Sequence, residues 1–391
     1  MKNNSIVASS KYGEKPRVLF VGAFPPPGKP IFGGQITACR TLINSSFSQK
    51  FDIIGLDSTQ ISNPPPGLTV RLIRSFFRVV RFCMLLIKSR PNAVLLFSAV
   101  GASTAEKGLM GWLARIAGIP VLMFPRGAEL IEVVSKSIFK RIWILASLRA
   151  ATYFLCQGPA WQKFAVNVVG FRINRAPIVP NWTATDALLA IGRRRTSVTH
   201  DRPLQLLFLA WLEKEKGIFE LLEACECLAN SYNFNLVIAG RGHAECRARR
   251  FIERGTLMGR VEFAGWVEGE KLRLLLEKSD IFVLPSWSEG FPNAMIEAMA
   301  AKMAVVVSAV GNIPDILKNR ENAMLVPPHD VNALLGAIQY LLANHDFRYA
   351  LASRGHKFVE ENHSVDVAVD QLSKVIFAAI EEREGENREE K

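Results

Sequence analysis

The chain has 391 residues, of which 49% are hydrophobic and 21% are charged, and its formal net charge is +12. That length suits two domains of ordinary size, and the balance of apolar and charged residues excludes an intrinsically disordered chain. The charge is uneven, because residues 1–199 carry 26 Lys and Arg against 7 Asp and Glu, whereas residues 200–391 carry 22 against 29. We therefore expect the first half to face an anionic partner, such as a membrane surface, a nucleic acid or an acidic polymer.

The first half alternates short apolar runs with helical patterns. A Gly-rich loop containing Gly33 and Gly34 follows the first run and precedes a helix predicted from Gln35 to Phe47. Alternation of this kind, with apolar runs bounded by turn residues, predicts a parallel, doubly wound sheet. The predicted strands of this half lie at 17–24, 51–56, 93–98, 120–124, 152–156 and 177–179.

The second half repeats this alternation after a polar, basic stretch that is typical of a linker. Its predicted strands lie at 204–210, 235–239, 261–263, 281–284, 304–308 and 323–326. Neither half has G-x-G-x-x-G in its first strand–helix turn, so a nicotinamide dinucleotide is not indicated. The sequence therefore predicts an α/β protein with two Rossmann-like parallel-sheet domains. The expected divisions are a first domain over 1–192, a linker over 193–203, a second domain over 204–370, and a C-terminal helix and charged tail over 371–391 that can cross back to the first domain.

Cysteine usage and hydropathy favour a cytoplasmic location. The six cysteines include no C-x-x-C pair, which is typical of reduced thiols. The first apolar run follows a polar leader and fits a strand better than a signal peptide. No run of about 20 apolar residues suggests a membrane span, so we expect any membrane association to be peripheral, at the inner face.

One segment, residues 71–90, is both basic and amphipathic. Its basic residues recur at helical spacing with no acid among them: Arg71, Arg74, Arg78, Arg81 and Lys88. Its apolar residues lie on the opposite side: Ile73, Phe76, Phe77, Val80, Met84 and Ile87. Two interpretations stay open, namely an outer helix that packs its apolar face on the sheet, or a helix whose basic face meets anionic lipid headgroups. Nucleic acid is a weaker third, because no DNA- or RNA-binding module accompanies the segment.

Two glutamates flank a turn in the stretch SEGFPNAMIEAMA, residues 288–300. Glu289 follows the predicted strand 281–284, at the end of the sheet where open α/β folds bind ligands. Glu297 lies one turn into the helix that follows. The pair predicts a ligand with hydroxyl groups at both ends, because each carboxylate can accept hydrogen bonds from one set.

The turn between the glutamates suits an anion. Gly290, Phe291 and Pro292 lead the chain into the helix, and proline is tolerated in a first helical turn. The N–H groups of that turn, around Asn293 and Ala294, are expected to point at the crevice and to bind a phosphate. A ligand with a central phosphate and hydroxyls at both ends has the form of a sugar nucleotide.

The E-x7-E spacing, within the whole stretch from Lys278 to Leu317, resembles the retaining glycosyltransferases of family 4, which have the GT-B fold. The resemblance covers nearly the whole chain and is strongest over 204–330. It implies two Rossmann-like domains that face each other across a cleft. Further landmarks are similar to the family's pattern in the same order: the glycine loop at Gly33 and Gly34, IVPN at 178–181, FLAWLEKEKG at 208–217, VIAGRGHAE at 237–245, and NAMLVPP at 322–328.

The resemblance implies a role for each of these residues. Lys216 would bind the donor diphosphate, and Gly33, Gly34 and Gly240 would lie near it. Glu289 would hold the hydroxyls of the donor sugar. The backbone N–H groups of Gly290 and Phe291 would help it, and Glu297 would bind the nucleotide ribose.

The chain departs from the family pattern in three ways. The usual phosphate-binding arginine is replaced by Trp211, which is expected to stack or pack, and Arg241 and Arg126 are the candidates to supply the missing cation. No histidine precedes His200, so a histidine beside the reacting sugar is absent. Arg126 is a candidate to contact phosphate or acceptor instead, and Glu129 is a weak candidate base. No D-x-D motif occurs, so no metal and no cofactor is expected beyond the sugar nucleotide as co-substrate.

The expected function is that of a retaining glycosyltransferase. It would move a sugar, of hexosyl type, from a nucleotide-diphosphate donor to a hydroxyl of a lipid-linked or oligosaccharide acceptor, in bacterial surface polysaccharide biosynthesis. Its partners would be the sugar nucleotide, a polyprenyl-linked or saccharide acceptor and an anionic membrane surface, but no nucleic acid. Two alternatives remain: a GT-B nucleotide-sugar 2-epimerase, and a non-catalytic scaffold of the same fold at the membrane.

Overall fold

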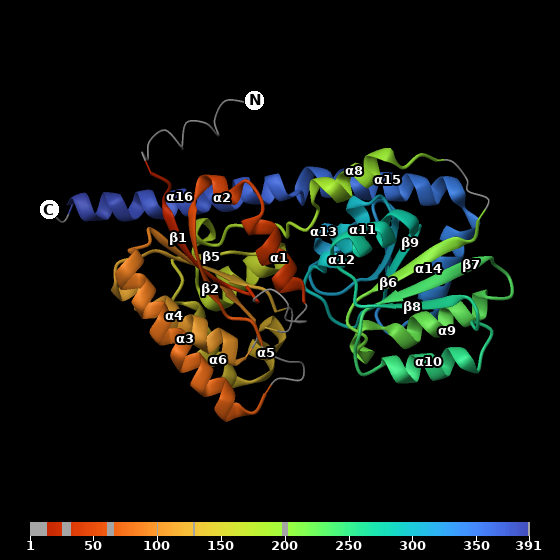
Figure 1. Cartoon of the computed structure of the whole chain (residues 1–391), viewed down its shortest axis with the longest axis horizontal. Coiled ribbons are helices and arrows are strands. Elements are labelled where there is room, and N and C mark those ends of the chain that lie inside the picture. The colour runs from red at the N-terminus through yellow and green to blue at the C-terminus, as the bar shows by residue number, and fades with distance from the viewer. Residues whose placement is uncertain are drawn as a thin grey trace. The chain divides into compact units, whose positions relative to one another are not determined.

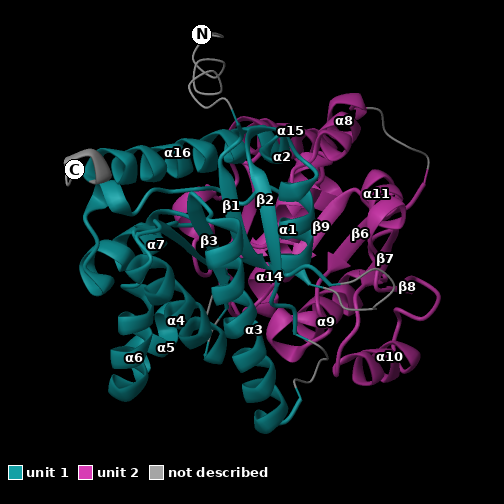
Figure 2. Ribbon diagram, turned by 60° about the vertical axis from the view of Figure 1, so that its left-hand side comes forward, with its two compact units in different colours: residues 1–182, 365–391 teal, residues 183–364 magenta. Residues whose placement is uncertain are grey.

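The computed structural model describes residues 14–25, 33–60, 66–99, 101–127, 130–197 and 202–389. The chain forms two compact units, one made of residues 1–182 and 365–391 and the other of residues 183–364 (Figure 2). These divisions differ from the expected 192 and 370. Residues before the expected linker form helix α8 (Asp186–Arg194), which packs against helices of the second unit, and the last helix begins at Val365 within the first unit.

The first unit contains a parallel sheet, as the sequence predicts (Figure 1). It has five strands rather than the six expected, in the order β2-β1-β3-β4-β5. The run at 93–98 is a strand over its full predicted length, because it is buried on both faces. The run at 177–179 is not a strand and forms one bridge, between Ile178 and Cys156. The strands are β1 (Arg17–Gly22), β2 (Asp52–Asp57), β3 (Ala93–Ser98), β4 (Val121–Pro125) and β5 (Tyr153–Phe154).

Helices cover both faces of this sheet, because strand side chains alternate between two cores. Leu19 and Val21 belong to one core, and Val18 and Phe20 to the other. The first core is covered by α3 (Leu68–Ser89), α4 (Ala102–Ile116), α5 (Leu130–Lys136), α6 (Ile138–Leu148) and α7 (Pro159–Phe164). The second is covered by α1 (Gly34–Ile43), α2 (Phe47–Lys50) and α16 (Val365–Glu389), so the helix predicted to reach Phe47 is two helices.

Helix α3 turns its apolar side outward, so the first of the two interpretations left open, that this side packs on the sheet, is wrong. All six apolar residues of that side are exposed, whereas Phe82 and Leu86 enter the core. Arg78 also departs from the expected open basic face. Its Nη2 donates to Oε2 of the buried Glu106 on α4 at 2.7 Å. Burial alone would raise the pKa of Glu106, but the bonds from Arg78 and the charge of Lys107 hold that pKa below its ordinary value.

The second unit contains a six-stranded parallel sheet in the order β11-β10-β9-β6-β7-β8. Its strands are β6 (Leu204–Leu209), β7 (Phe234–Ala239), β8 (Val261–Gly265), β9 (Ile281–Leu284), β10 (Ala304–Ser308) and β11 (Met324–Val326). Besides α8, its helices are α9 (Ile218–Leu228), α10 (Glu245–Glu253), α11 (Gly269–Lys278), α12 (Asn293–Ala300), α13 (Ile313–Ile316), α14 (Val331–Ala343) and α15 (His345–Asn362).

The order of these strands creates a crevice. Strand β6 pairs with β7 on one side and with β9 on the other, so the loops that follow β6 and β9 leave the sheet in opposite directions. Such a topological switch point is where open α/β sheets bind ligands, outside the carboxyl ends of the strands. Lys216 follows β6, and Glu289 follows β9.

Removal of the Arg78 side chain should destabilise the first unit, because it leaves Glu106 buried without its main partner. We expect Arg78→Ala to lower the free energy of unfolding by about 3 kcal/mol. Arg81→Ala, on the exposed side of the same helix, should change it by less than about 0.5 kcal/mol. Urea unfolding followed by far-UV circular dichroism measures both. Equal losses in the two variants would contradict a structural role for Arg78.

Candidate functional site

Lys216 and Glu289 meet at the switch point. Lys216 ends the short helix η3 (Lys214–Lys216) after β6, and Glu289 lies in the loop after β9. The Lys216 Nζ lies 2.6 Å from Glu289 Oε1, and Ser286 Oγ donates to the same oxygen at 2.9 Å. Both charged side chains are mostly buried. The structure therefore places a cation and a carboxylate, far apart in the sequence, at one point of the crevice.

Glycines let the backbone close around this contact. Gly217 has φ +74°, and a Cβ there would lie 2.1 Å from the carbonyl oxygen of Pro285. Gly311 has φ +59°, and its Cβ would lie 1.7 Å from the carbonyl oxygen of Glu289. Only glycine fits both the conformation and the space at these positions. The loop that carries Glu289 is thus held between the turns that follow β6 and β10.

Two backbone hydrogen bonds fix the same loop. Trp287 N donates to the Glu215 carbonyl oxygen at 2.8 Å, and Asn312 N donates to the Gly290 carbonyl oxygen at 3.0 Å. Phe291 is buried and its ring lies 4.9 Å from that of His363. The chain enters α12 from this fixed point, so the start of that helix is held beside Glu289.

Helix α12 brings Glu297 to the same part of the unit. Pro292 is its N-cap residue, and no side chain caps the helix there. Asn293 and Ala294 form the first turn, as predicted. Glu297 is only 7% exposed, and no cation among the described residues pairs with it. Burial raises the pKa of Glu297 to about 7, because ionisation is costly away from water.

Trp211, which replaces the arginine expected at this position, forms an aromatic pair with Trp266. Trp211 follows β6, Trp266 follows β8, and their ring centroids lie 4.9 Å apart. Gly240 and Arg241 follow β7, which lies between those strands. The Arg241 carbonyl accepts from Leu212 N at 2.9 Å, while its side chain is exposed. Trp211 therefore packs against Trp266 with its ring tilted by 45°.

The remaining predicted site residues belong to the first unit. Gly33 and Gly34 start α1, whereas residues 26–32 of the predicted glycine loop, and Glu129, lie outside the described residues. Arg126 follows β4, at the carboxyl end of that sheet. The structure therefore brings Lys216, Glu289 and Glu297 together in one unit, and Arg126 in the other.

Arg126 lies in an aromatic box. The guanidinium lies 5.6, 5.0 and 5.2 Å from the ring centroids of Phe97, Phe124 and Trp182. Its Nη1 donates to Asn181 Oδ1 at 2.7 Å. Burial among these rings lowers the pKa of Arg126 to about 10, and no described carboxylate pairs with it. The rings and Asn181 hold the guanidinium in place, and the guanidinium can still bind an anion.

A further cluster lies beside Glu289, and sequence analysis did not predict it. Trp287 Nε1 donates to Glu220 Oε1 at 2.7 Å, and the His329 ring lies 4.4 Å from the Trp287 ring. The Lys214 Nζ lies 5.0 Å above the same indole. These four residues come from two separate loops, the short helix η3 and helix α9 (Ile218–Leu228), so only the fold brings them together.

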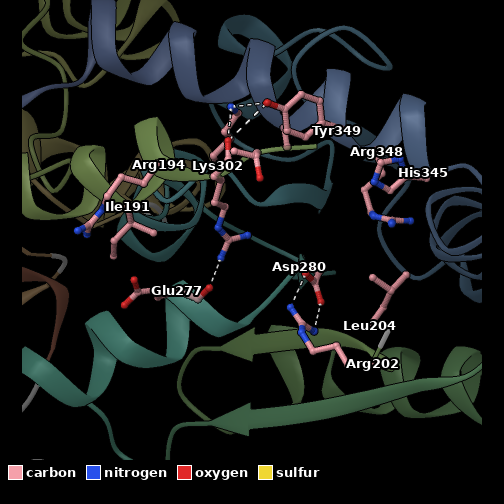
Figure 3. Close-up of a pocket in the computed structure, with 13 residues that line it drawn as sticks. Ile191, Arg194, Arg202, Leu204, Glu277, Asp280, Lys302, His345, Arg348 and Tyr349 are labelled. Atoms are coloured by element: carbon pink, nitrogen blue, oxygen red, sulfur yellow. Dashed lines mark hydrogen bonds and ion pairs between the residues drawn. The ribbon is translucent and has the colours of Figure 1, made fainter. Parts of the chain in front are cut away.

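A pocket of about 420 Å³ lies elsewhere in the second unit, at the amino ends of β6 and β9 (Figure 3). It is rich in cations: Arg194, Arg195, Arg202, Lys302 and Arg348. Internal partners already engage them, since Arg202 pairs with Asp280 at 2.7 Å and Lys302 donates to the Tyr349 hydroxyl at 3.0 Å. The cations of this pocket therefore belong to a structural network of hydrogen bonds and ion pairs, and the pocket is not part of the candidate site.

Among the described residues, two other features are absent: a metal-binding cluster and a membrane-spanning helix. No group of three or more His, Cys, Asp or Glu side chains in that part of the chain could hold a metal ion. None of its helices is long and apolar enough to cross a membrane.

Burial of Glu297 makes stability depend on pH. The folded pKa of about 7 lies above the ordinary 4.5, so the penalty is absent below pH 4.5 and grows as the pH rises to 7. At pH 8 we expect Glu297→Gln to be more stable than the wild type by up to about 3 kcal/mol. At pH 5 the difference should be small.

Urea unfolding at the two pH values measures this effect. Glu253→Gln, at an exposed position of α10, is the control and should show no such pH dependence. A difference between Glu297→Gln and the wild type that stays constant from pH 5 to pH 8 would contradict the burial argument.

The chain is similar in sequence to known glycosyltransferases. Residues 193–358 match the family described as Glycosyl transferases group 1. An uncharacterized glycosyltransferase of Methanocaldococcus jannaschii is 31% identical over 49% of this chain and 49% of its own length. A lipopolysaccharide core biosynthesis glycosyltransferase of Rhizobium meliloti is 27% identical over 58% of this chain and 64% of its own. The chain thus spans about half to two thirds of the length of these curated relatives.

Solved structures extend the similarity to both units. Sucrose-phosphate synthase from Thermosynechococcus elongatus aligns with a TM-score of 0.73 over 93% of this chain and all of its own, at 21% identity. Anabaena HepE, solved in complex with UDP-glucose, aligns with a TM-score of 0.67 over 93% of this chain and 99% of its own, at 15% identity. The chain therefore has the GT-B fold, and its residues 193–358 match the family model of the group 1 glycosyltransferases.

Proposed function

We propose that this protein is a glycosyltransferase that uses a nucleotide-diphosphate sugar as its donor. The observation that carries the proposal is the 2.6 Å contact of Lys216 with Glu289 at the switch point of a group 1 glycosyltransferase domain. The buried carboxyl of Glu297 on the following helix supports it. HepE, which shares the fold, has been solved with UDP-glucose bound, and a nucleotide sugar is the donor class we infer here.

The donor would be held by three kinds of group. Lys216 and the first-turn N–H groups of α12 would bind the diphosphate, since cations and helix N-termini both stabilise phosphate charge. Glu289 would accept hydrogen bonds from the sugar hydroxyls, and Glu297 from the ribose hydroxyls. The bond between Lys216 and Glu289 keeps the lysine in place before the donor arrives, at little cost in ordering when it binds.

The reaction we propose retains the configuration of the sugar, in keeping with the resemblance to family 4. The bond between C1 and the diphosphate oxygen breaks through an oxocarbenium-like state, and Lys216 and α12 stabilise the departing negative charge. The acceptor hydroxyl then bonds to C1 on the same face. Its proton passes to the departing phosphate oxygen, so no enzymatic base is required. Without a D-x-D motif, we assign the stabilisation of the diphosphate to protein groups rather than to a metal.

The acceptor would bind to the first unit. Arg126 is a preorganised cation with no described acidic partner, and a phosphate of a lipid-linked acceptor would supply the missing negative charge. The basic composition of this half and the exposed helix α3 favour a peripheral position at the inner face of a membrane. The Rhizobium meliloti relative, named for lipopolysaccharide core biosynthesis, supports a place in bacterial surface polysaccharide synthesis.

A donor panel tests the nucleotide-sugar site. We expect one UDP- or GDP-sugar to raise the Tm of the wild type by about 2 °C or more at saturation. The shift should vanish in Glu297→Ala, which loses the ribose contact, and persist in the control Glu253→Ala. Differential scanning fluorimetry reads all three proteins. A panel without any stabilising donor would overturn the proposal in favour of a non-catalytic scaffold.

A second experiment separates the donor and acceptor roles. Lys216→Ala should lose the donor-induced Tm shift and turnover together. Arg126→Gln should keep the shift but lower turnover by about a hundredfold, because it acts on the acceptor. Release of nucleoside diphosphate is measured with and without a polyprenyl-diphosphate-linked sugar. Release of a free 2-epimeric sugar without any acceptor would instead identify an epimerase, and loss of the Tm shift in Arg126→Gln would contradict the assigned acceptor role.

A further inference from the structure

The outward side of helix α3 is an exposed apolar stripe. Ile87 is 78% exposed and Phe76 is 65% exposed, and the stripe continues through its neighbours at helical spacing. Its members are Leu72, Ile73, Phe76, Phe77, Val80, Met84 and Ile87. Soluble monomers rarely expose a contiguous apolar surface of this kind, so it marks an interaction site.

Exposed apolar side chains also occur on α4, which lies beside α3, and on α6, which lies beside α4. Helix α4 contacts both α3 and α6, and all three cover the same face of the sheet (Figures 1 and 2). Trp112 Nε1 donates to the Ala146 carbonyl oxygen at 3.1 Å, and Gly108 leaves room for Ser147, so α4 and α6 approach closely. The exposed apolar residues of α4 are Leu109, Trp112 and Ile116, and those of α6 are Ile138, Phe139 and Ile142.

We name the α3 stripe, together with these residues of α4 and α6, the three-helix surface. Phe139 and Ile116 are each 83% exposed, more than any residue of the α3 stripe. Periodicity in the sequence indicated the α3 part alone. The other two parts became evident only because the fold places α4 and α6 in the same layer.

The exposed charged residues of the three helices all have one sign. The exposed charged residues of the three helices are Arg71, Arg74, Arg81, Lys88, Arg115, Lys140 and Arg141. The sequences of α3 and α6 contain no acid, and the single acid of α4, Glu106, is buried against Arg78. Arg78 is therefore part of the packing between helices, and the remaining cations form the border of the apolar surface.

We propose that the three-helix surface docks on an anionic lipid bilayer. The aromatic and aliphatic side chains would enter the boundary between headgroups and acyl chains, and the bordering Lys and Arg would contact headgroup phosphates. This proposal rests on the proposed function and adds to it the surface of the protein that binds the membrane. It concerns lipid binding without donor or acceptor, so it can fail or hold independently of sugar transfer.

Charge favours a bilayer over a second copy of the chain. A dimer formed through this surface would place basic residues of both copies side by side, and like charges at an interface cost free energy. An anionic bilayer instead neutralises all of them, and each Lys or Arg near such a surface adds to binding. Helix α3 has too many charges to cross the bilayer, in keeping with a helix that lies in its plane.

Vesicle flotation with the full chain tests the proposal. The probes are vesicles of phosphatidylglycerol and phosphatidylcholine in equal parts, and vesicles of phosphatidylcholine alone. We expect binding to the anionic vesicles that weakens as salt is raised. The double variant Phe76→Gln/Phe77→Gln should bind at least about tenfold more weakly, because two inserted rings are lost. Arg74→Glu/Arg81→Glu should lose the preference for phosphatidylglycerol.

Matched controls come from the second unit. Met258→Gln removes a side chain that is as exposed as Phe76, and Arg254→Glu reverses an exposed charge; neither should change binding. Far-UV circular dichroism and the donor-induced Tm shift establish that each variant is folded. Wild-type protein that stays unbound at low salt, or a Phe76/Phe77 variant that binds as the wild type does, would overturn the proposal. A lipid-free dimer by light scattering that the Phe76/Phe77 variant abolishes, without vesicle binding, would assign the surface to self-association instead.

Discussion

The contact between Lys216 and Glu289 is the constraint around which the second unit is arranged. It joins the segments that follow two adjacent strands, β6 and β9, at the switch point of the sheet. Gly217 and Gly311 allow the backbone to approach the loop that carries Glu289. Helix α12 begins where this loop ends. A partly buried ion pair contributes little net stability, so its value lies in holding two functional groups in register.

Among the candidate site residues, each unit keeps one charged group in an unfavourable environment. Burial raises the pKa of Glu297 to about 7 and lowers that of Arg126 to about 10, so each group is destabilised in its charged form. Folding alone gives no reason to keep an acid and a cation in such places. Under the proposed function, the donor hydroxyls would offset the penalty at Glu297 and an acceptor phosphate would offset the penalty at Arg126, because binding then supplies the missing partners.

Much of this arrangement was predictable from the sequence, where local pattern and fold agree. Strands β3, β9 and β10 are buried on both faces, so their apolar runs give their bounds directly. The orientation of α3 was not predictable, because periodicity gives two faces but not which one packs. Arg78 belongs inside only because Glu106, 28 residues later, lies opposite it. The contact of His329 with Trp287 likewise joins distant loops, and no spacing in the sequence signals it.

The last helix carries a consequence for how the chain is made. Helix α16 supplies Leu372, Ile376 and Ile380 to one core of the first unit, whose strands all come from the N-terminal half. During synthesis, all residues of the second unit are translated before this helix is complete. One face of the sheet of the first unit must therefore wait with only α1 and α2 against it, and the later-made unit can begin to fold before the first unit is complete. Chaperone demand in the cell should fall on the N-terminal sheet, although it is translated earlier.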